Sequence, residues 1–228
     1  MDSAHSARGT APTPMPAVMA GYGLAEYGAS WSDSDRVLVT VHGRDRTSDE
    51  LPIGFVSHPV SRVTRILAPH ANSKSWYDSR YDAPRAENAD QVNVGLGKIA
   101  AAFALAGEKG IPTSKIVLAG FSQGGCMVAE YLLSGAQRPA AAAIFTGSVL
   151  DIAHPRQPTA GLAGMPVVLS GGDADPWLPA ADLRATGTLL EALGADVRFQ
   201  IFPDGDHVVR SQEMSLLGEL VQGVGPRT

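Results

Sequence analysis

The sequence contains a single cysteine, Cys126, and this scarcity excludes two kinds of site. One thiol can form neither a disulfide within the chain nor a zinc or iron–sulfur site built on cysteines. Basic residues are not in excess, because 18 lysines and arginines stand against 23 aspartates and glutamates, so nothing predicts a surface for nucleic-acid phosphates. No apolar run reaches the roughly 18 residues that a membrane-spanning helix needs. We therefore expect a globular protein with neither a nucleic-acid partner nor a segment inserted in a membrane.

The first 20 residues do not have the pattern of a secretory signal, which needs a basic start and then about 7–15 consecutive apolar residues. Three prolines interrupt any apolar run there, and Arg8 is the only basic residue. We expect residues 1–16 to form a flexible leader and the protein to be cytoplasmic. Residues 17–228 contain no polar linker and no internal repeat, so they are expected to form one domain.

From residue 37 onward, short apolar runs alternate with segments of helical periodicity. The predicted strands are residues 37–41, 63–68, 115–119, 141–146, 167–170 and 197–201, with a weaker candidate at 20–25 that contains two glycines. The predicted helices are residues 87–107, 123–134, 183–193 and 214–224. This alternation indicates an α/β fold, with a mostly parallel sheet and helices on both faces. Ligands of such sheets bind beyond the carboxyl ends of the strands, where we therefore expect the functional residues.

Residues 120–124, Gly-Phe-Ser-Gln-Gly, follow the predicted strand 115–119 and precede a predicted helix. They match Gly-x-Ser-x-Gly, which in this context is the pattern of a nucleophile elbow. Such a turn lifts the hydroxyl of Ser122 clear of the sheet, and small flanking residues let strand and helix approach closely. The motif alone fits a glycine-rich turn with an incidental serine equally well, so the candidate partners of Ser122 decide between the two interpretations.

A serine hydroxyl is a weak nucleophile until a base removes its proton, and a histidine base needs a carboxylate to fix its tautomer. In this topology the chain order is serine, then acid, then histidine. Of the six histidines, only His154 and His207 follow Ser122. His154 comes too early to leave room for a strand that bears the acid, whereas His207 lies in a turn between the last predicted strand and the final helix. We predict that His207 is the base.

The acid is expected just after the strand 167–170, where Asp173 and Asp175 follow within a glycine-rich turn. Asp175 is favoured because Pro176 fixes the turn immediately after it and Trp177 can shield one side. Asp173 is the alternative, although its position suits a residue that shapes the turn by bonding to backbone N–H groups.

Four segments share their pattern and order with one known family: Val39–Gly43, Gly120–Gly125, Gly172–Pro179 (Gly-x-x-Asp-Pro-x-x-Pro), and the Gly205–His207 turn followed by Gln212–Met214. Over residues 37–222 the chain resembles the phospholipase/carboxylesterase family of α/β-hydrolases, which also contains the acyl-protein thioesterases. The resemblance implies an α/β-hydrolase fold for residues 17–228 and no cofactor. It also implies that Ser122, Asp175 and His207 form a catalytic triad.

The resemblance further implies an oxyanion hole formed by the backbone N–H groups of Gln123 and Arg44. Two such preorganised donors stabilise the negative charge of a tetrahedral intermediate. Family members usually have glycine where this sequence has Asp45, so the charged run from Arg44 through Arg46 departs from the pattern. It either recognises a polar end of the substrate or is simply solvated. His42 is expected to hold the loop rather than to act in catalysis.

Three aromatic residues are expected to bind substrate. Trp76 and Tyr77 resemble a Trp-Tyr position of the family near the site, and Trp177 follows the predicted acid. The two indoles would be flat apolar walls for an acyl or aromatic group, although anchoring of loops is an equally good interpretation. Cys126, on the helix after Ser122, is expected to be a packed core thiol.

We therefore predict a serine hydrolase that cleaves a carboxylic ester or thioester through an acyl-enzyme. The alternatives are a peptidase with the same triad, a binding protein or receptor that retains the triad but turns over slowly, and a lysophospholipase acting at a membrane surface. The expected partner is a small ester or thioester, and no metal ion is expected. No feature of the sequence supports a homodimer.

Overall fold

The computed structural model describes residues 23–224, so the predicted leader, residues 1–16, lies outside the described residues. The apolar runs form one seven-stranded sheet in the order β1-β3-β2-β4-β5-β6-β7. The strands are β1 (Leu24–Gly28), β2 (Arg36–Val41), β3 (Thr64–Pro69), β4 (Ile116–Phe121), β5 (Ala141–Phe145), β6 (Pro166–Gly172) and β7 (Asp196–Phe202). β1 is antiparallel to β3, and every other neighbouring pair is parallel. The prediction of a mostly parallel sheet is confirmed.

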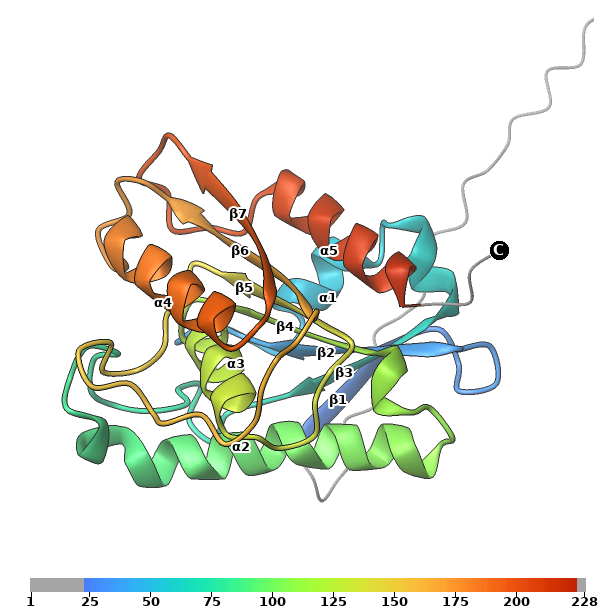
Figure 1. The fold of residues 1–228 in the computed structure, drawn as a ribbon. Coiled ribbons are helices and arrows are strands. Elements are labelled where there is room, and N and C mark those ends of the chain that lie inside the picture. Colours follow the sequence, from blue (N-terminus) through green and yellow to red (C-terminus); the bar gives the residue numbers. More distant parts are fainter. Residues whose placement is uncertain (1–22, 225–228) are drawn as a thin grey trace, which may run out of the picture.

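Helices cover both faces of this sheet (Figure 1). They are α1 (Glu50–Phe55), α2 (Arg85–Glu108), α3 (Gln123–Leu133), α4 (Ala180–Ala192) and α5 (Ser211–Gly223), with 3₁₀ turns at Pro59–Val63 and Thr113–Lys115. On β2, Val37 and Val39 belong to the core that also contains residues of α2, α3 and α4, whereas Leu38 belongs to the core of α1 and α5. Alternate side chains of β2 thus fill two separate cores, which explains why the predicted strand 37–41 is apolar at four of its five positions. None of the helices within residues 23–224 combines the length and apolar character needed to cross a bilayer.

Two local features differ from the predictions. The weak strand candidate at 20–25 is replaced by the antiparallel edge strand Leu24–Gly28, and residues 20–22 lie outside the described part of the chain. The short helix α1 was not predicted, because its six residues are too few to show a helical period. The parallel strands place the ends of β4, β6 and β7 at the same edge of the sheet, and residues 122, 175 and 207 follow these three strands.

Candidate active site

Ser122 occupies a sharp turn between β4 and α3, with φ 54° and ψ −121°. A left-handed φ of this kind is strained for a residue with a side chain, and here the Ser122 N–H is held by the Phe145 carbonyl oxygen at 2.9 Å. The flanking residues must be glycines because there is no room for a side chain at either position. A Cβ at Gly124 would overlap the Val41 carbonyl oxygen, and a Cβ at Gly120 would overlap the carbonyl of Gly124 itself. The geometry is therefore that of a nucleophile elbow rather than of a glycine-rich turn with an incidental serine.

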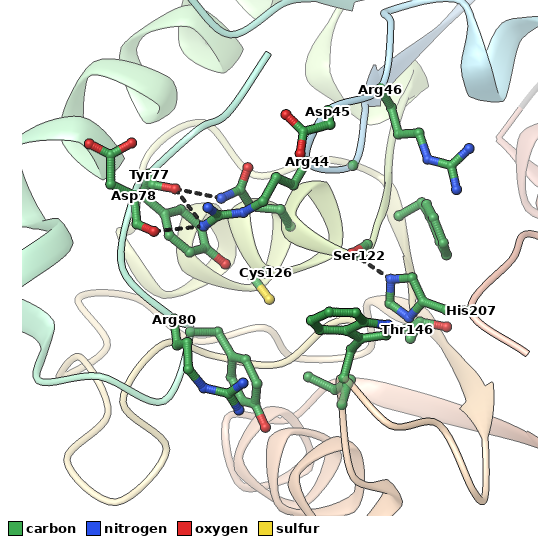
Figure 2. A pocket seen from close by; sticks show the side chains of 16 residues that line it. Arg44, Asp45, Arg46, Tyr77, Asp78, Arg80, Ser122, Cys126, Thr146 and His207 are labelled. Atoms are coloured by element: carbon green, nitrogen blue, oxygen red, sulfur yellow. Dashed lines mark hydrogen bonds between the residues drawn. The ribbon is translucent and has the colours of Figure 1, made fainter. Parts of the chain in front are cut away.

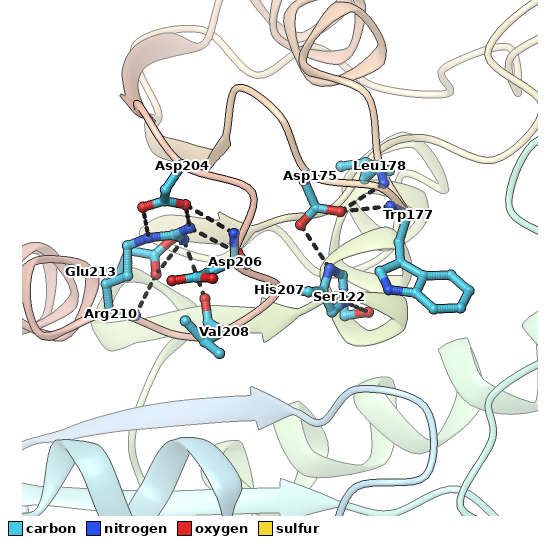
Figure 3. Close-up of polar contacts among 10 residues, drawn as sticks. All are labelled: Ser122, Asp175, Trp177, Leu178, Asp204, Asp206, His207, Val208, Arg210 and Glu213. Atoms are coloured by element: carbon cyan, nitrogen blue, oxygen red, sulfur yellow. Dashed lines mark hydrogen bonds and ion pairs between the residues drawn. The ribbon is translucent and has the colours of Figure 1, made fainter.

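Three side chains from the ends of different strands meet at this turn (Figure 3). His207 Nε2 lies 2.8 Å from Ser122 Oγ, and His207 Nδ1 lies 2.8 Å from Asp175 Oδ2. The other carboxylate oxygen of Asp175 accepts the N–H groups of Trp177 at 2.8 Å and Leu178 at 3.0 Å. Because an ionised carboxylate can only accept hydrogen bonds, the proton of the neutral imidazole sits on Nδ1. Nε2 is then free to accept the proton of the Ser122 hydroxyl.

The structure distinguishes His207 from His154, and Asp175 from Asp173. The side chain of His154 is 84% exposed, and its one polar partner within residues 23–224 is the carboxylate of Asp151, at 3.3 Å. Asp173 is exposed, and its N–H donates to the Phe202 carbonyl in the turn, whereas the carboxylate of Asp175 is fully buried. His207 and Asp175 are thus the histidine and the aspartate that the fold brings to Ser122.

The loop that carries His207 is fastened by Arg210 (Figure 3). The Arg210 guanidinium pairs with the Asp204 carboxylate through Nε and Nη2, and it donates to the Asp206 carbonyl at 2.8 Å. At the start of α5, the buried carboxylate of Glu213 accepts the Arg210 backbone N–H at 2.6 Å. The loop is therefore tied both to itself and to α5, which restricts where the imidazole can lie.

The loop after β2 presents the N–H of Arg44. His42 Nδ1 lies 2.7 Å from the Gly43 carbonyl oxygen, and its Nε2 accepts the Ala71 N–H at 3.1 Å. This pattern places the imidazole proton on Nδ1, and burial lowers the pKa of His42, so the ring stays neutral. The bond to the Gly43 carbonyl orients the Gly43–Arg44 peptide and hence the Arg44 N–H. Neither this N–H nor that of Gln123 has a backbone or side-chain acceptor within residues 23–224.

Glu50 supports the same loop, and the sequence reasoning missed it. Its Oε2 accepts the Gly43 N–H at 3.2 Å, while its Oε1 lies 3.5 Å from Arg46 Nε. Burial raises the pKa of Glu50, and the Gly43 N–H and the nearby charges of Arg46 and His207 oppose that rise. No motif marks this residue; the one available signal is an acid at the start of the helix that follows the His-Gly turn.

A cleft of about 400 Å³ opens beside Ser122 (Figure 2). Two of the three aromatic residues expected to bind substrate line it, Tyr77 and Trp177, and Trp177 is 63% exposed. Trp76 does not line this cleft. Its indole is 3% exposed and donates to the His42 carbonyl at 2.8 Å. The expectation that Trp76 forms a wall of the substrate pocket is therefore wrong, and its side chain anchors the loop instead.

Two polar side chains hold the loop of residues 75–79 beside the elbow. Gln123 Oε1 accepts the Trp76 N–H at 2.8 Å, and Gln123 Nε2 donates to the Tyr77 carbonyl at 2.7 Å. Arg44 Nη2 donates to the carbonyls of residues 77, 78 and 79 at 2.8, 3.0 and 3.2 Å. These loop contacts were not predicted from the sequence, because the partners of the two side chains are remote in the chain.

Cys126 also lines the cleft, with 3% of its surface exposed. Burial raises the pKa of the Cys126 thiol, so the group stays protonated and is a poor nucleophile. Burial, together with the neighbouring Cys126, likewise raises the pKa of Tyr77. Among the described residues that line this cleft, Ser122 is the one whose hydroxyl has an imidazole within hydrogen-bond distance. Within residues 23–224, no three His, Cys, Asp or Glu side chains gather in a way that could hold a metal ion.

Comparison with known proteins gives a consistent result. Residues 49–223 match the model of the phospholipase/carboxylesterase family. A phospholipase/carboxylesterase from Dyadobacter fermentans is 26% identical over 87% of this chain and 95% of its own, with a TM-score of 0.80. A carboxylesterase from Mesorhizobium loti is 20% identical over 92% of this chain and 99% of its own, with a TM-score of 0.74. A carboxylesterase from Bacillus cereus is 19% identical over 88% and 93% of the two chains, with a TM-score of 0.71.

Proposed function

This chain belongs to the phospholipase/carboxylesterase family of carboxylic ester hydrolases, and from that premise we propose that it cleaves a carboxylic ester or thioester through an acyl-enzyme on Ser122. The observation that carries the proposal is the continuous hydrogen-bonded line from Ser122 Oγ through the imidazole of His207 to the carboxylate of Asp175, with 2.8 Å at each step. A nucleophile, a base and a group that orients the base are the three parts that such chemistry needs.

In the first step, His207 Nε2 removes the hydroxyl proton while Ser122 Oγ attacks the carbonyl carbon of the substrate. The electron pair of the carbonyl π bond moves to oxygen, and the resulting charge is stabilised by the N–H groups of Gln123 and Arg44. Asp175 stabilises the imidazolium that forms. Because Asp175 already accepts two backbone N–H groups, it is held in place before the charge develops.

In the second step, the tetrahedral intermediate collapses and the bond to the leaving oxygen or sulfur breaks. The imidazolium of His207 returns its proton to that atom, and the acyl group remains on Ser122. A water molecule then gives a proton to His207 and attacks the acyl carbon, and the same two N–H groups stabilise the second intermediate. Its collapse releases the carboxylic acid and restores the serine hydroxyl.

The test compares four proteins in the hydrolysis of p-nitrophenyl butyrate: the wild type, Ser122→Ala, His207→Gln and His154→Gln. Loss of the serine or the histidine of comparable triads lowers turnover on the order of 10⁶-fold, so we expect the first two variants to have essentially no turnover. His154 is exposed and outside the cleft, so its variant should keep the wild-type rate. Undiminished hydrolysis by Ser122→Ala, or equal losses in the two histidine variants, would refute the assignment.

A further inference from the structure

We propose that the substrate carries a carboxylate close to its scissile ester and that the guanidinium of Arg44 binds this carboxylate. The inference rests on the proposed function, since it places the substrate in the cleft beside Ser122. It also assigns a role to Arg44 within the charged run from Arg44 through Arg46, which the sequence left open between recognition of the substrate and solvation.

The charge that faces the cleft is predominantly positive. The charged residues that line it are Arg44, Arg46, Arg80, Asp45 and Asp78. The carboxylate of Asp78 points away from the cleft (Figure 2), and it accepts a hydrogen bond from the side-chain amide of Gln91 on α2 at 2.8 Å. Three guanidinium groups therefore stand against one remaining carboxylate. This contrasts with the chain as a whole, whose formal net charge is −5 and which would otherwise repel anions.

The three arginines differ in how far their charge is already neutralised. Arg80 pairs with the carboxylate of Asp82 through two nitrogens, at 2.9 and 3.0 Å. Arg46 Nε lies 3.5 Å from the carboxylate of Glu50. Arg44 has no carboxylate within ion-pair distance among residues 23–224, so its charge is the one of the three that remains available to a ligand.

The guanidinium of Arg44 is nevertheless held in place. Nη2 donates to the carbonyls of residues 77 and 78 (Figure 2) and to that of residue 79. The guanidinium carbon lies 5.9 Å from the centre of the Tyr77 ring. Nε and Nη1 have no acceptor within the described part of the chain, so they remain free to donate to an anion. A cation whose position is fixed before binding loses little conformational freedom when a carboxylate arrives.

The place of Arg44 also limits where the carboxylate can be. The backbone N–H of this residue is the proposed donor to the scissile carbonyl oxygen, so its guanidinium lies one arginine side chain away from that donor. The carboxylate must therefore be joined to the ester by a short linker. A monoester of a short dicarboxylic acid has this arrangement.

The test uses two p-nitrophenyl esters of nearly equal size, the monoester of glutaric acid and its neutral methyl ester. We expect the wild type to have the higher kcat/KM with the anionic ester. Hydrogen bonds to charged groups contribute about 1.5–3 kcal/mol, which corresponds to about 10- to 150-fold in rate. Arg44→Gln should lower the ratio of the two kcat/KM values by about that factor. The ratio is the readout because Arg44 also holds residues 77–79, so both rates can fall.

Arg80→Gln is the matched control, because it removes the same charge from the same cleft but from a residue that already has a partner. Its ratio should change by less than about threefold. As a second measurement on the wild type, glutarate should inhibit hydrolysis of the neutral ester, and added salt should weaken this inhibition. Equal kcat/KM values for the two esters in the wild type, or a ratio that Arg44→Gln leaves unchanged, would overturn the proposal. Continued hydrolysis of the neutral ester would show that the proposed function still stands.

Discussion

Replacement of Asp175 by asparagine tests how the site controls its proton. One oxygen of Asp175 is already committed to the N–H groups of Trp177 and Leu178, and the other faces His207 Nδ1. In Asp175→Asn the single amide oxygen must stay with the two backbone donors, because an NH₂ group cannot accept their hydrogen bonds. The amide nitrogen then faces Nδ1 and donates to it. The imidazole proton is forced onto Nε2, which can no longer accept the proton of Ser122.

The expected loss follows from this wrong tautomer. The same substitution in a comparable triad lowers kcat about 10⁴-fold, which corresponds to about 5.5 kcal/mol of transition-state stabilisation at about 1.36 kcal/mol per tenfold change. The assay is steady-state hydrolysis of p-nitrophenyl butyrate at pH 8, together with the thermal midpoint of each protein. Asparagine has almost the same volume as aspartate, so the fold should persist while turnover falls.

Asp173→Asn is the matched control. Asp173 lies two positions earlier in the same turn, but its side chain is exposed and makes no hydrogen bond to another described residue. We expect it to retain the wild-type kcat within about twofold. An Asp175→Asn enzyme within tenfold of wild type, or an equal loss in Asp173→Asn, would contradict the assignment of the acid and the tautomer argument with it.

Three further outcomes follow from the surroundings of the site. Gly124→Ala should lower the free energy of unfolding by several kcal/mol, because the added Cβ overlaps a backbone carbonyl. Gly97→Ala on α2 should raise it by about 0.5–1 kcal/mol, because a Cβ there meets nothing within 4 Å. Urea denaturation measures both changes. Burial lowers the pKa of His42 below the ordinary 6.5, so the unfolded chain takes up a proton at a higher pH than the folded protein does. The free energy of unfolding should therefore fall as the pH drops below about 6.5. Denaturation at pH 7.5 and 5.5 should show a smaller fall in His42→Gln than in the wild type. Glu50→Ala removes the acceptor of the Gly43 N–H and should lower kcat about tenfold. Glu50→Gln keeps an acceptor oxygen, so its kcat should fall less. Equal losses of kcat would show that this hydrogen bond does not account for the effect of Glu50.

The central strands and the elbow could be predicted because their physical requirements leave a local trace. A strand buried on both faces is built mainly from apolar residues, and residues 37–41 all lie in β2. Residues 116–119 of the predicted strand 115–119 lie in β4, whereas Lys115 ends the 3₁₀ turn before it. The two glycines of the elbow are required because strand and helix leave no room for a Cβ. The order of Ser122, Asp175 and His207 follows from the order of the strands that precede them, so it too can be seen in the sequence.

The environment of the site was harder to predict because it depends on contacts between remote segments. The residues that neighbour Trp76 in the sequence do not show whether its indole faces the cleft or the core. The indole faces the core because its N–H donates to the carbonyl of His42, which is remote in the chain. The side chain of Gln123 meets a loop 46 and 47 positions earlier in the chain. Glu50 acts on Gly43 through a loop whose fold has no sequence signature. Such contacts exist only once the sheet and its loops are assembled.

The most direct test of the whole account is where a mechanism-based probe becomes attached. A fluorophosphonate reacts with a serine only when a base activates its hydroxyl and an oxyanion site stabilises the product of attack. Incubation of the wild type, followed by mass spectrometry of its peptides, should place one adduct on Ser122, and Ser122→Ala should remain unlabelled. An adduct on another residue, or labelling of Ser122→Ala at the wild-type rate, would show that the 2.8 Å contact between Ser122 and His207 is not a working nucleophile and base.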